Sequence, residues 1–328
     1  MTPLGVLQAG VGRAFPGAVA VALHHGRVLF EEAVGTIDYH APARCTTAYD
    51  LASLTKPLAT WSVLVDALDR GQVQLDQQVA AILNAPTLVG ITVRHLAGHT
   101  SGLAAWRALD PDRPRADVLH TPPGCPPGLR AVYSDLGYMA LGWFLEAVLG
   151  APLDQLVARN RGRFCLGSIS FSAPEGVAPT EMGVPIGVVH DSNARLLGGV
   201  AGHAGLFGTA MDVACFGHAL LGLRVGPLGP LIDRLWYSGP ACSASTTWRL
   251  GFDTVTPGGS SAGHHFSPRA VGHLGYTGTS LWIDPERALV VVLLSNRVHP
   301  NDLPNPEIRR LRPAFHDALI RTSFLNRS

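Results

Sequence analysis

Ala52-Ser53-Leu54-Thr55-Lys56-Pro57 is the stretch that decides how this 328-residue chain is interpreted, because Lys56 is its only lysine. Lysine and arginine together number 25, so arginine supplies every other basic side chain. Arginine is effectively never deprotonated, whereas a lysine amine gives up its proton when it is buried or lies near other cations. Ser53 precedes this amine by about one helical turn, as a nucleophile beside its proton acceptor would. The alternative is compositional drift that left one lysine by accident, and a four-residue pattern alone does not exclude it.

Pro57 restricts the local geometry. Proline has no N–H and clashes with the carbonyl four residues earlier, so it fits only the first turn of a helix. We therefore expect Ser53 at or just before the start of a helix, with its backbone N–H free and the helix dipole favouring negative charge. Lys56 follows Ser53 by three residues, which places its amine on the same face as the hydroxyl.

A second candidate segment is Tyr133-Ser134-Asp135, which precedes an apolar stretch expected to be a helix from Leu136 to Leu149. A tyrosine just before a helix can present its phenol into a cleft, and a nearby ammonium would lower the pKa of that phenol. The alternative is that Tyr133 packs at a domain seam while Asp135 caps the helix.

A third segment, Gly272-His273-Leu274-Gly275-Tyr276-Thr277-Gly278-Thr279, runs into the strongest hairpin pattern of the chain. Small residues here would let a substrate backbone approach an edge strand, and His273 would supply a hydrogen-bond donor or a cation. The alternative is a glycine-rich strand start with a histidine satisfied by its surroundings.

Hairpins at the two ends of the chain and helices between them predict the fold. Strands are expected at Ala18–Leu23 and Val28–Phe30, and again at Leu281–Asp284 and Ala288–Leu294. Because hairpins link neighbouring strands in antiparallel fashion, we expect an α/β (α+β) fold with an antiparallel sheet flanked by helices.

Helical patterns complete the prediction. They are expected at Trp61–Leu68, at Thr209–Leu221 after a capping box with Asp212 in the Glu position, and at Pro306–Phe324. We predict a sheet domain from residues 1–52 and 206–328 and an inserted, mostly helical domain from residues 53–205, with the active site at their junction.

Composition narrows the possible partners. The formal net charge is +1, without a basic run, so we expect neither nucleic acid nor a charged membrane surface as a partner. No apolar run is long enough to span a bilayer. The five cysteines are far apart and form no C-x-x-C, which argues against a disulfide framework, a zinc site or a redox pair. No secretory signal is visible, so we expect a cytoplasmic protein unless a leader was removed.

Three rival motifs have weak contexts. Gly259-Ser260-Ser261-Ala262-Gly263 matches the G-x-S-x-G nucleophile elbow, but neither a strand before it nor a helix after it is expected. His95 and His99 have i, i+4 spacing without the Glu of H-E-x-x-H, so packing roles are favoured over a zinc site. Gly198–Gly205 lacks dinucleotide-loop spacing, and we interpret it as a tight connection near the cleft.

The three candidate segments, in this order and at these separations, resemble the serine β-lactamase and DD-peptidase superfamily. They are most similar to its class C β-lactamase-like branch, which also holds carboxylesterases, D-aminopeptidases and penicillin-binding protein relatives. The resemblance covers most of the chain. It also takes in Ile91-Thr92-Val93-Arg94-His95-Leu96, His99-Thr100-Ser101-Gly102-Leu103 and Gly205-Leu206-Phe207-Gly208-Thr209-Ala210.

This resemblance implies roles for the matched positions. Ser53 would be the acylated nucleophile, and Lys56 and Tyr133 would share the proton transfers that activate it and protonate the leaving group. The backbone N–H groups of Ser53 and Tyr276 would form the oxyanion hole. No cofactor or metal is implied.

Two departures from the family pattern concern the substrate. Asp135 stands where the family's Tyr-x-Asn motif has Asn, and His273-Leu274-Gly275 replaces Lys-Thr-Gly. Both changes weaken recognition of the β-lactam carboxylate, so we expect a serine hydrolase of small esters or amides, with D-amino-acid peptides as further candidates. Two alternatives stay open: a true β-lactamase or DD-peptidase, and a non-catalytic ligand-binding protein on the same fold. Segments such as Trp106–Thr121 would carry the specificity.

Overall fold

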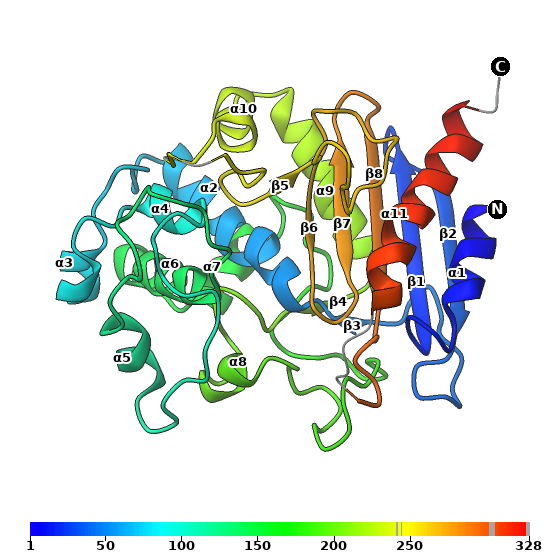
Figure 1. Ribbon diagram of the computed structural model, residues 1–328, viewed down its shortest axis with the longest axis horizontal. Helices are drawn as coiled ribbons and strands as arrows, with labels where there is room; N and C mark the ends of the chain where they lie inside the picture. Colours follow the sequence, from blue (N-terminus) through cyan, green and yellow to red (C-terminus); the bar gives the residue numbers. More distant parts are fainter. Residues whose placement is uncertain (241, 244, 302–305, 326–328) are drawn as a thin grey trace.

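The computed structural model describes residues 1–240, 242–243, 245–301 and 306–325. It is built on a six-stranded antiparallel sheet in the order β2-β1-β8-β7-β6-β5 (Figure 1). The strands are Gly17–His24 (β1), Arg27–Gly35 (β2), Asp253–Thr254 (β5), Val271–Leu274 (β6), Ser280–Asp284 (β7) and Leu289–Ser295 (β8). A separate ribbon pairs Tyr49–Asp50 (β3) with Phe207–Gly208 (β4). The predicted antiparallel sheet, built from both ends of the chain, is confirmed.

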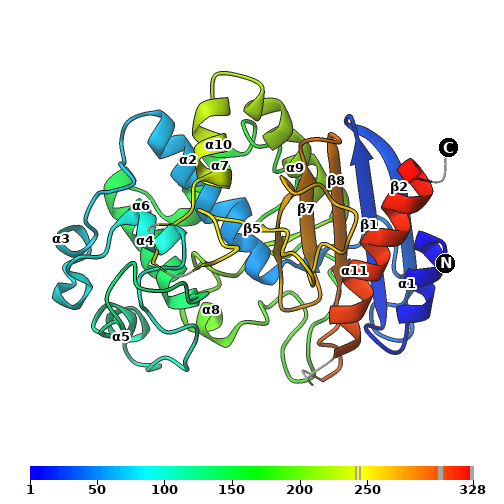
Figure 2. The ribbon, with the colours of Figure 1, turned by 45° about the horizontal axis from the view of Figure 1, so that its top comes forward.

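The helices lie on both faces of the sheet and beside its β5–β6 edge (Figures 1 and 2). On one face lie α1 and α11, on the other α9, and the remaining helices form the part of the molecule beyond β5. Their bounds are Pro3–Gly10 (α1), Ser62–Asp69 (α2), Ala80–Leu83 (α3), Val93–Ala97 (α4), Pro114–Leu119 (α5), Asp135–Leu149 (α6), Leu153–Asn160 (α7), Ser192–Leu196 (α8), Ala210–Arg224 (α9), Gly229–Tyr237 (α10) and Pro306–Ile320 (α11).

Strand β1 is an interior strand of the sheet, between β2 and β8, and both of its faces are apolar. Its alanines pack into the core under α1 and α11, and its larger residues pack into the core under α9. The alanines are Ala18, Ala20 and Ala22, and the larger residues are Val19, Val21 and Leu23. Side chains of a strand alternate between faces, so the small residues face one helical layer and the larger ones face the other.

The predicted elements are confirmed with small shifts of their ends. Both hairpins form, β1 with β2 and β7 with β8. Helix α6 begins at Asp135, and Ser134 caps it by accepting a hydrogen bond from Gly137 N–H at 3.0 Å. Thr209 caps α9 and accepts from Asp212 N–H at 3.2 Å, as the capping pattern predicts.

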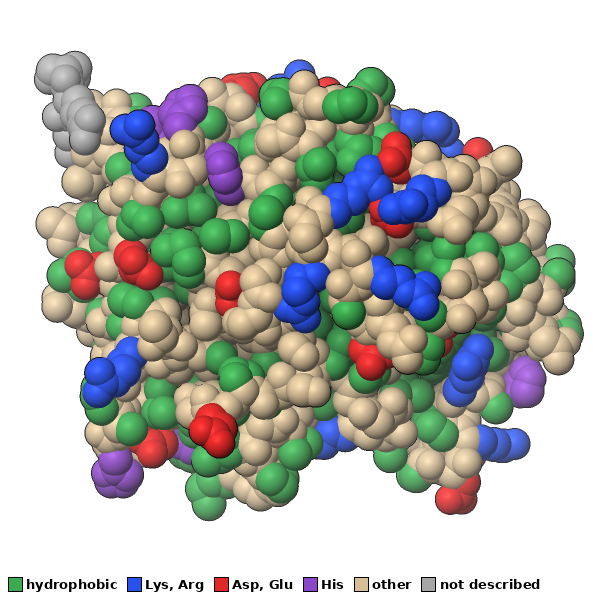
Figure 3. Space-filling model, turned by 180° about the vertical axis from the view of Figure 1, so that it is seen from behind, with side chains coloured by type: hydrophobic (Ala, Val, Ile, Leu, Met, Phe, Trp, Pro, Cys, Tyr) green, Lys and Arg blue, Asp and Glu red, His purple; other side chains and the backbone are tan. Residues whose placement is uncertain are grey.

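Charged side chains of both signs are interspersed over the face shown in Figure 3, without a stripe of one sign. Within the described ranges, no single helix is long and apolar enough to cross a membrane.

Candidate active site

The segment that carries Ser53 follows β3, where the sheet meets the helical region (Figure 1). A 3₁₀ turn, Ala52–Leu54, carries it, and a π-helical turn, Lys56–Trp61, leads into α2. Pro57 is the second residue of the π-helical turn, where its missing N–H costs no hydrogen bond. Ser53 is therefore at the start of a helical segment, as predicted, although the first turns are 3₁₀ and π rather than α.

The residue before Ser53 is held in an unusual backbone conformation. Ala52 has a φ of +48°, in the left-handed region that costs a non-glycine residue about 1–3 kcal/mol. Asp50 holds this turn, because its Oδ1 accepts a hydrogen bond from Ala52 N–H at 2.8 Å. Its Oδ2 accepts from His190 N–H at 2.7 Å, and burial raises the pKa of this carboxyl group. Asp50 thus ties the Ser53 turn to the loop before α8.

The amine of Lys56 is fully buried beside the Ser53 hydroxyl. Its Nζ lies 3.0 Å from Ser53 Oγ, 2.6 Å from Asp135 Oδ1 and 3.3 Å from the carbonyl oxygen of His203. The ring of Tyr133 packs against the same amine, with its centroid 4.7 Å from Nζ. The structure therefore brings together Ser53, Lys56, Tyr133 and Asp135.

The electrostatics of this cluster differ from the expectation for Tyr133. Burial raises the pKa of the Tyr133 phenol, and hydrogen bonding and charge from Lys56 offset this only in part. The expected fall in the pKa of Tyr133 is therefore wrong. Burial by itself lowers the pKa of Lys56, but the Asp135 carboxylate and the Tyr133 oxygen outweigh it, so the pKa of Lys56 lies above its usual value. The solitary lysine rests as an ammonium group.

Asp135 has a charged partner that the sequence pattern did not reveal. The sequence pattern assigned it to substrate binding, where its charge would repel an anion. In the structure its carboxylate forms an ion pair with Lys56 at 2.6 Å, and its side chain is 15% exposed. The negative charge is thus largely balanced inside the protein rather than presented to a substrate.

Strand β6 and the turn after it pack against the Ser53 segment. Thr277 Oγ1 donates to Asp50 O at 2.8 Å and Thr279 Oγ1 donates to Leu51 O at 3.1 Å, which joins this turn to the Ser53 segment. Gly275 lies so close that a Cβ on it would come within 2.7 Å of Leu51 O. Glycine at this position allows this turn to approach the Ser53 segment. The expectation that the small residues admit a substrate backbone stays a prediction.

His273 lies in β6 beside Tyr133 but is almost completely buried. Its Nδ1 lies 2.9 Å from Leu274 O, an acceptor, so Nδ1 carries the proton and Nε2 does not. Burial, followed by the charge of Lys56, lowers the pKa of His273 to about 3. Of the two expected roles of His273, hydrogen-bond donor or cation, the cation is therefore wrong.

A second buried histidine adjoins the same tyrosine. His99 Nδ1 accepts a hydrogen bond from Ser134 N–H at 3.0 Å, so its proton is on Nε2. Its ring centroid lies 4.6 Å from Tyr133 and 4.9 Å from Trp248. Burial and the charge of Lys56 hold the pKa of His99 well below its usual range. The histidines beside Tyr133 are thus neutral packing partners of the phenol.

Two backbone N–H groups are available at the junction. Among the hydrogen bonds of the described residues, neither Ser53 N–H nor Tyr276 N–H has an acceptor. Tyr276 itself is 55% exposed, and its ring lies under the guanidinium of Arg297 and stacks on His190. Free donors beside a nucleophile are what an oxyanion requires.

The glycine-rich connection Gly198–Gly205 lies next to the site, as predicted. Gly202 packs against the backbone of α6, where a Cβ would collide with Tyr138 O. Thr60 Oγ1 donates to Gly202 O at 2.6 Å, and the following carbonyl, of His203, meets Lys56. The connection therefore helps to enclose the buried amine.

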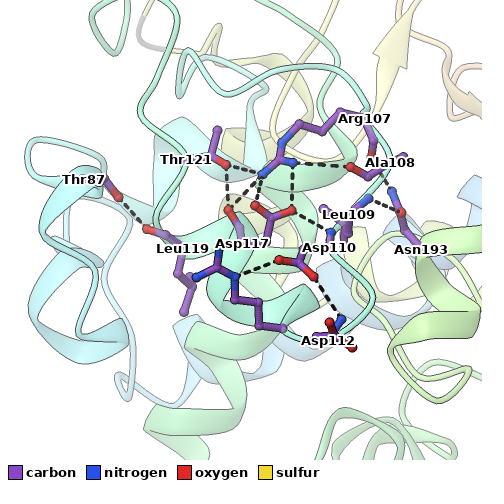
Figure 4. Close-up of polar contacts among 11 residues, drawn as sticks. Thr87, Arg107, Ala108, Leu109, Asp110, Asp112, Asp117, Leu119, Thr121 and Asn193 are labelled. Atoms are coloured by element: carbon purple, nitrogen blue, oxygen red, sulfur yellow. Dashed lines mark hydrogen bonds and ion pairs between the residues drawn. The ribbon is translucent and has the colours of Figure 1, made fainter.

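The segment Trp106–Thr121 is ordered by an arginine (Figure 4). Arg107 binds both carboxylate oxygens of Asp117, at 2.8 and 2.7 Å, and also Thr121 Oγ1 at 2.6 Å. Asn193 of α8 also holds this segment, because its side-chain amide donates to Arg107 O at 2.9 Å. The segment before it is fixed to the site because Asp135 N–H donates to Ala105 O at 2.8 Å.

Arg312 of α11 supports the β6–β7 turn from behind. It is 6% exposed, and one of its terminal nitrogens donates to Gly275 O and Thr279 O, both at 2.8 Å. These carbonyls flank Tyr276 in the chain. Arg312 therefore holds the turn that presents Tyr276 N–H.

The rival motifs do not form sites. Gly259–Gly263 lies in a loop between β5 and β6, where Ser260 Oγ accepts from Ala262 N–H at 3.1 Å. His95 closes the capping box of α4 with Thr92, and His99 binds Ser134 as described. Among the described residues, no three His, Cys, Asp or Glu side chains could hold a metal ion.

Several residues at the site were missed by sequence reasoning. Asp50, Trp248, His203 and Arg312 contact the cluster or its supports from distant segments. Only the position of Asp50, three residues before Ser53, lay close enough in sequence to be suspected.

The fold and the site together define the class. The sequence profile of the Beta-lactamase family matches residues 5–314. The chain belongs to this family, whose members are serine hydrolases.

Individual relatives agree with this assignment. A protein of Escherichia coli (strain K12) named "Putative D-alanyl-D-alanine carboxypeptidase" is 30% identical over 81% of this chain and 73% of its own length. The structure of EstCE1, "a hydrolase with promiscuous acyltransferase activity", has a TM-score of 0.77 at 22% identity and covers 96% of this chain and 97% of its own. A class C beta lactamase from Rhodobacter sphaeroides has a TM-score of 0.73 at 19% identity and covers 98% of each chain. At these identities the two structures show a shared fold.

Proposed function

We propose that this protein hydrolyses small esters or amides through an acyl-enzyme formed on Ser53. The observation that carries the proposal is the buried Lys56 Nζ at 3.0 Å from Ser53 Oγ. A hydroxyl at neutral pH is a weak nucleophile and needs a neighbouring group that takes its proton. The only lysine of the chain is in position to receive it.

The remaining site residues fit the other parts of an acyl transfer. The carbonyl carbon of the substrate would bond to Ser53 Oγ, and its oxygen would accept from the N–H groups of Ser53 and Tyr276. Tyr133 packs against Lys56 and, as a phenol that keeps its proton, would donate that proton to the leaving group. The substrate would lie beside the turn after β6, which Gly275 holds against the Ser53 segment.

The substrate class follows from the charges. Lys56 is balanced by Asp135, and His273 is neutral above about pH 3, so neither offers a free cation to a substrate carboxylate. Leu274 replaces the hydroxyl residue of the family's third motif. An ester carbonyl is more electrophilic than an amide carbonyl and needs less leaving-group protonation. We therefore favour short neutral esters, with amides as slower substrates.

A DD-peptidase is the second candidate, because the Escherichia coli relative carries that name at 30% identity. A β-lactamase and a non-catalytic binding protein are weaker candidates. The pairing of Ser53 with a buried Lys56 disfavours a pure binding protein, since binding alone needs no proton acceptor beside a hydroxyl.

Turnover assays with the purified protein separate these candidates. We expect measurable hydrolysis of p-nitrophenyl acetate and butyrate, with hydrolysis of a chromogenic cephalosporin far slower. Faster release of D-alanine from a D-Ala-D-Ala peptide would favour the DD-peptidase, and efficient cephalosporin turnover the β-lactamase. Stoichiometric ligand binding without turnover of any substrate would overturn the proposal.

A further inference from the structure

The hydrogen bonds of Lys56 leave it no lone pair for the Ser53 proton. An ammonium group has three N–H donors and no acceptor. Nζ lies 3.0 Å from Ser53 Oγ, 2.6 Å from Asp135 Oδ1 and 3.3 Å from the carbonyl oxygen of His203, and the Tyr133 oxygen also hydrogen-bonds to it. The carbonyl and the carboxylate can only accept, so both are paired with N–H groups. Lys56 must therefore lose a proton before it can take one from Ser53.

Other titratable groups around the amine are poorly placed to receive that proton. Those near Lys56 on the elements packed against it are Tyr133, Tyr138, His99, His273, Asp191 and His203. The two tyrosines keep their phenolic protons, because burial raises the pKa of each. Both His99 and His273 are neutral rings that do not hydrogen-bond to Nζ.

Asp191 is also engaged elsewhere. Its Oδ1 lies 2.9 Å from His203 Nε2 and accepts from Ala194 N–H at 2.7 Å. Of the described carboxylates, Asp135 is the one in contact with Lys56, and its 2.6 Å separation is short for a charge-assisted hydrogen bond.

We propose that Asp135 takes the proton of Lys56 during acylation, so that Ser53, Lys56 and Asp135 form a proton relay. This inference rests on the proposed function. A proton passes from Nζ to Asp135 Oδ1, and a rotation about the Cε–Nζ bond turns the freed lone pair to Ser53. The Oγ–carbonyl bond then forms as the hydroxyl proton moves to Nζ.

The rest of the cycle restores the pair. The bond from the carbonyl carbon to the leaving oxygen breaks, and that oxygen takes the phenolic proton of Tyr133. Lys56 then gives a proton to the Tyr133 oxygen. Asp135 then returns its proton to Lys56. In hydrolysis, water gives one proton to the same relay, and Ser53 regains its own when the acyl bond breaks. Asp135 acts through Lys56, so it is a positioning residue for the proton rather than a group that touches the substrate.

The relay makes a prediction about the direction of a pH shift. In the wild type the proton moves within the pair, so kcat/KM for p-nitrophenyl acetate should be flat through neutral pH. In Asp135→Asn the lysine must lose its proton to solvent instead. The pH below which kcat/KM falls should then be higher than in the wild type. At pH 7 kcat/KM should be reduced about 100-fold, the lower end of general acid–base contributions.

Two matched variants complete the experiment. Asp135→Glu keeps a carboxylate and should restore a flat profile, and Asp76→Asn, at an exposed carboxylate paired with Arg94, should leave the profile unchanged. An acid limb that moves down in Asp135→Asn would overturn the relay, because Asp135 would then only hold Lys56 in its charged form. A lower rate with an unchanged profile would overturn it too and give Asp135 a structural role.

Labelling separates this inference from the proposed function. If a fluorophosphonate labels Ser53 in the wild type but the acid limb of Asp135→Asn moves down in pH, the relay alone is refuted. Absence of labelling in the wild type refutes the acyl-enzyme itself, and the relay with it.

Discussion

Two buried cations support the site, one in the Ser53 segment and one behind the β6–β7 turn, and their partners differ. Lys56 contacts a hydroxyl, a carboxylate and one carbonyl, whereas the hydrogen bonds of Arg312 to the described residues go to the carbonyls of Gly275 and Thr279. Burial lowers the pKa of Arg312 to about 9, which still leaves it charged at neutral pH. The first cation therefore has partners that can exchange protons with it, and the second has partners that cannot.

This difference explains why one position is a lysine and the other an arginine. A guanidinium keeps its charge and holds backbone carbonyls in a fixed geometry. An amine can pass a proton between a carboxylate and a hydroxyl. The comparison predicts that exchanging the two kinds of side chain damages chemistry at one site and geometry at the other.

The largest effect is expected from Lys56→Arg. The variant keeps the positive charge beside Asp135 but cannot accept the proton of Ser53. We expect kcat/KM for p-nitrophenyl acetate to fall by about 10²–10⁴-fold, the range for losing general acid–base help. Turnover near the wild-type level would show that Lys56 is only a fixed charge, and a thermal unfolding scan would separate this result from misfolding.

A smaller effect is expected from Arg312→Met. The carbonyls of Gly275 and Thr279 each keep a hydrogen bond within the turn, from Gly278 N–H and Gly275 N–H, so the turn should loosen rather than unfold. We expect kcat to fall by about tenfold, because one misplaced oxyanion donor costs up to about 10²–10³-fold.

The matched control for Arg312→Met is Arg310→Met, at an exposed position of the same helix paired with Glu307. It should leave kcat unchanged. Equal activity of both variants and the wild type would remove the positioning role of Arg312.

The smallest effect is expected from lowering the pH from 8 to 6 in a kinetic assay with an anionic ester. Because His273 titrates near pH 3, it gains no charge in this window, and the KM for an anionic ester should change by less than about twofold from this group. A KM that improves strongly at pH 6 in the wild type, but not in His273→Gln, would show that His273 does become a cation.

Acid should also weaken the folded state through the buried histidines. His99, His273 and His316 all have pKa values lowered by burial, so between about pH 6.5 and 4 the unfolded chain binds more protons than the folded one. Stability therefore rises with pH across this window and falls on acidification. Urea unfolding midpoints at pH 7 and pH 4.5 measure this change, and a higher midpoint at pH 4.5 would contradict the sign.

The parts of the molecule predicted well from sequence are those set by local pattern. Both hairpins, helix α6 and the closing helix α11 follow from periodicity, turn residues and caps. Pro57 placed Ser53 at a helix start for steric reasons, and the solitary Lys56 pointed to the chemistry. The division into residues 1–52 with 206–328 and residues 53–205 stays a prediction.

The errors arose where distant segments meet. Asp135 lies 79 residues after Lys56 in the chain, so nothing local showed that its carboxylate would neutralise the amine. The burial of His273 and the partial burial of Tyr133 depend on packing with Trp248 and His99, which come from two other segments. Desolvation, rather than residue type, sets the protonation of both groups, and desolvation becomes visible only once the fold is known.

The central claim is that Ser53 is the acylated residue, and intact-mass spectrometry after incubation with a fluorophosphonate tests it most directly. We expect one adduct on the wild type and on Ser261→Ala, whose serine lies in the G-x-S-x-G loop. Ser53→Ala should carry none while keeping its circular dichroism spectrum and thermal unfolding midpoint. Labelling that persists in Ser53→Ala and disappears in Ser261→Ala would contradict the account.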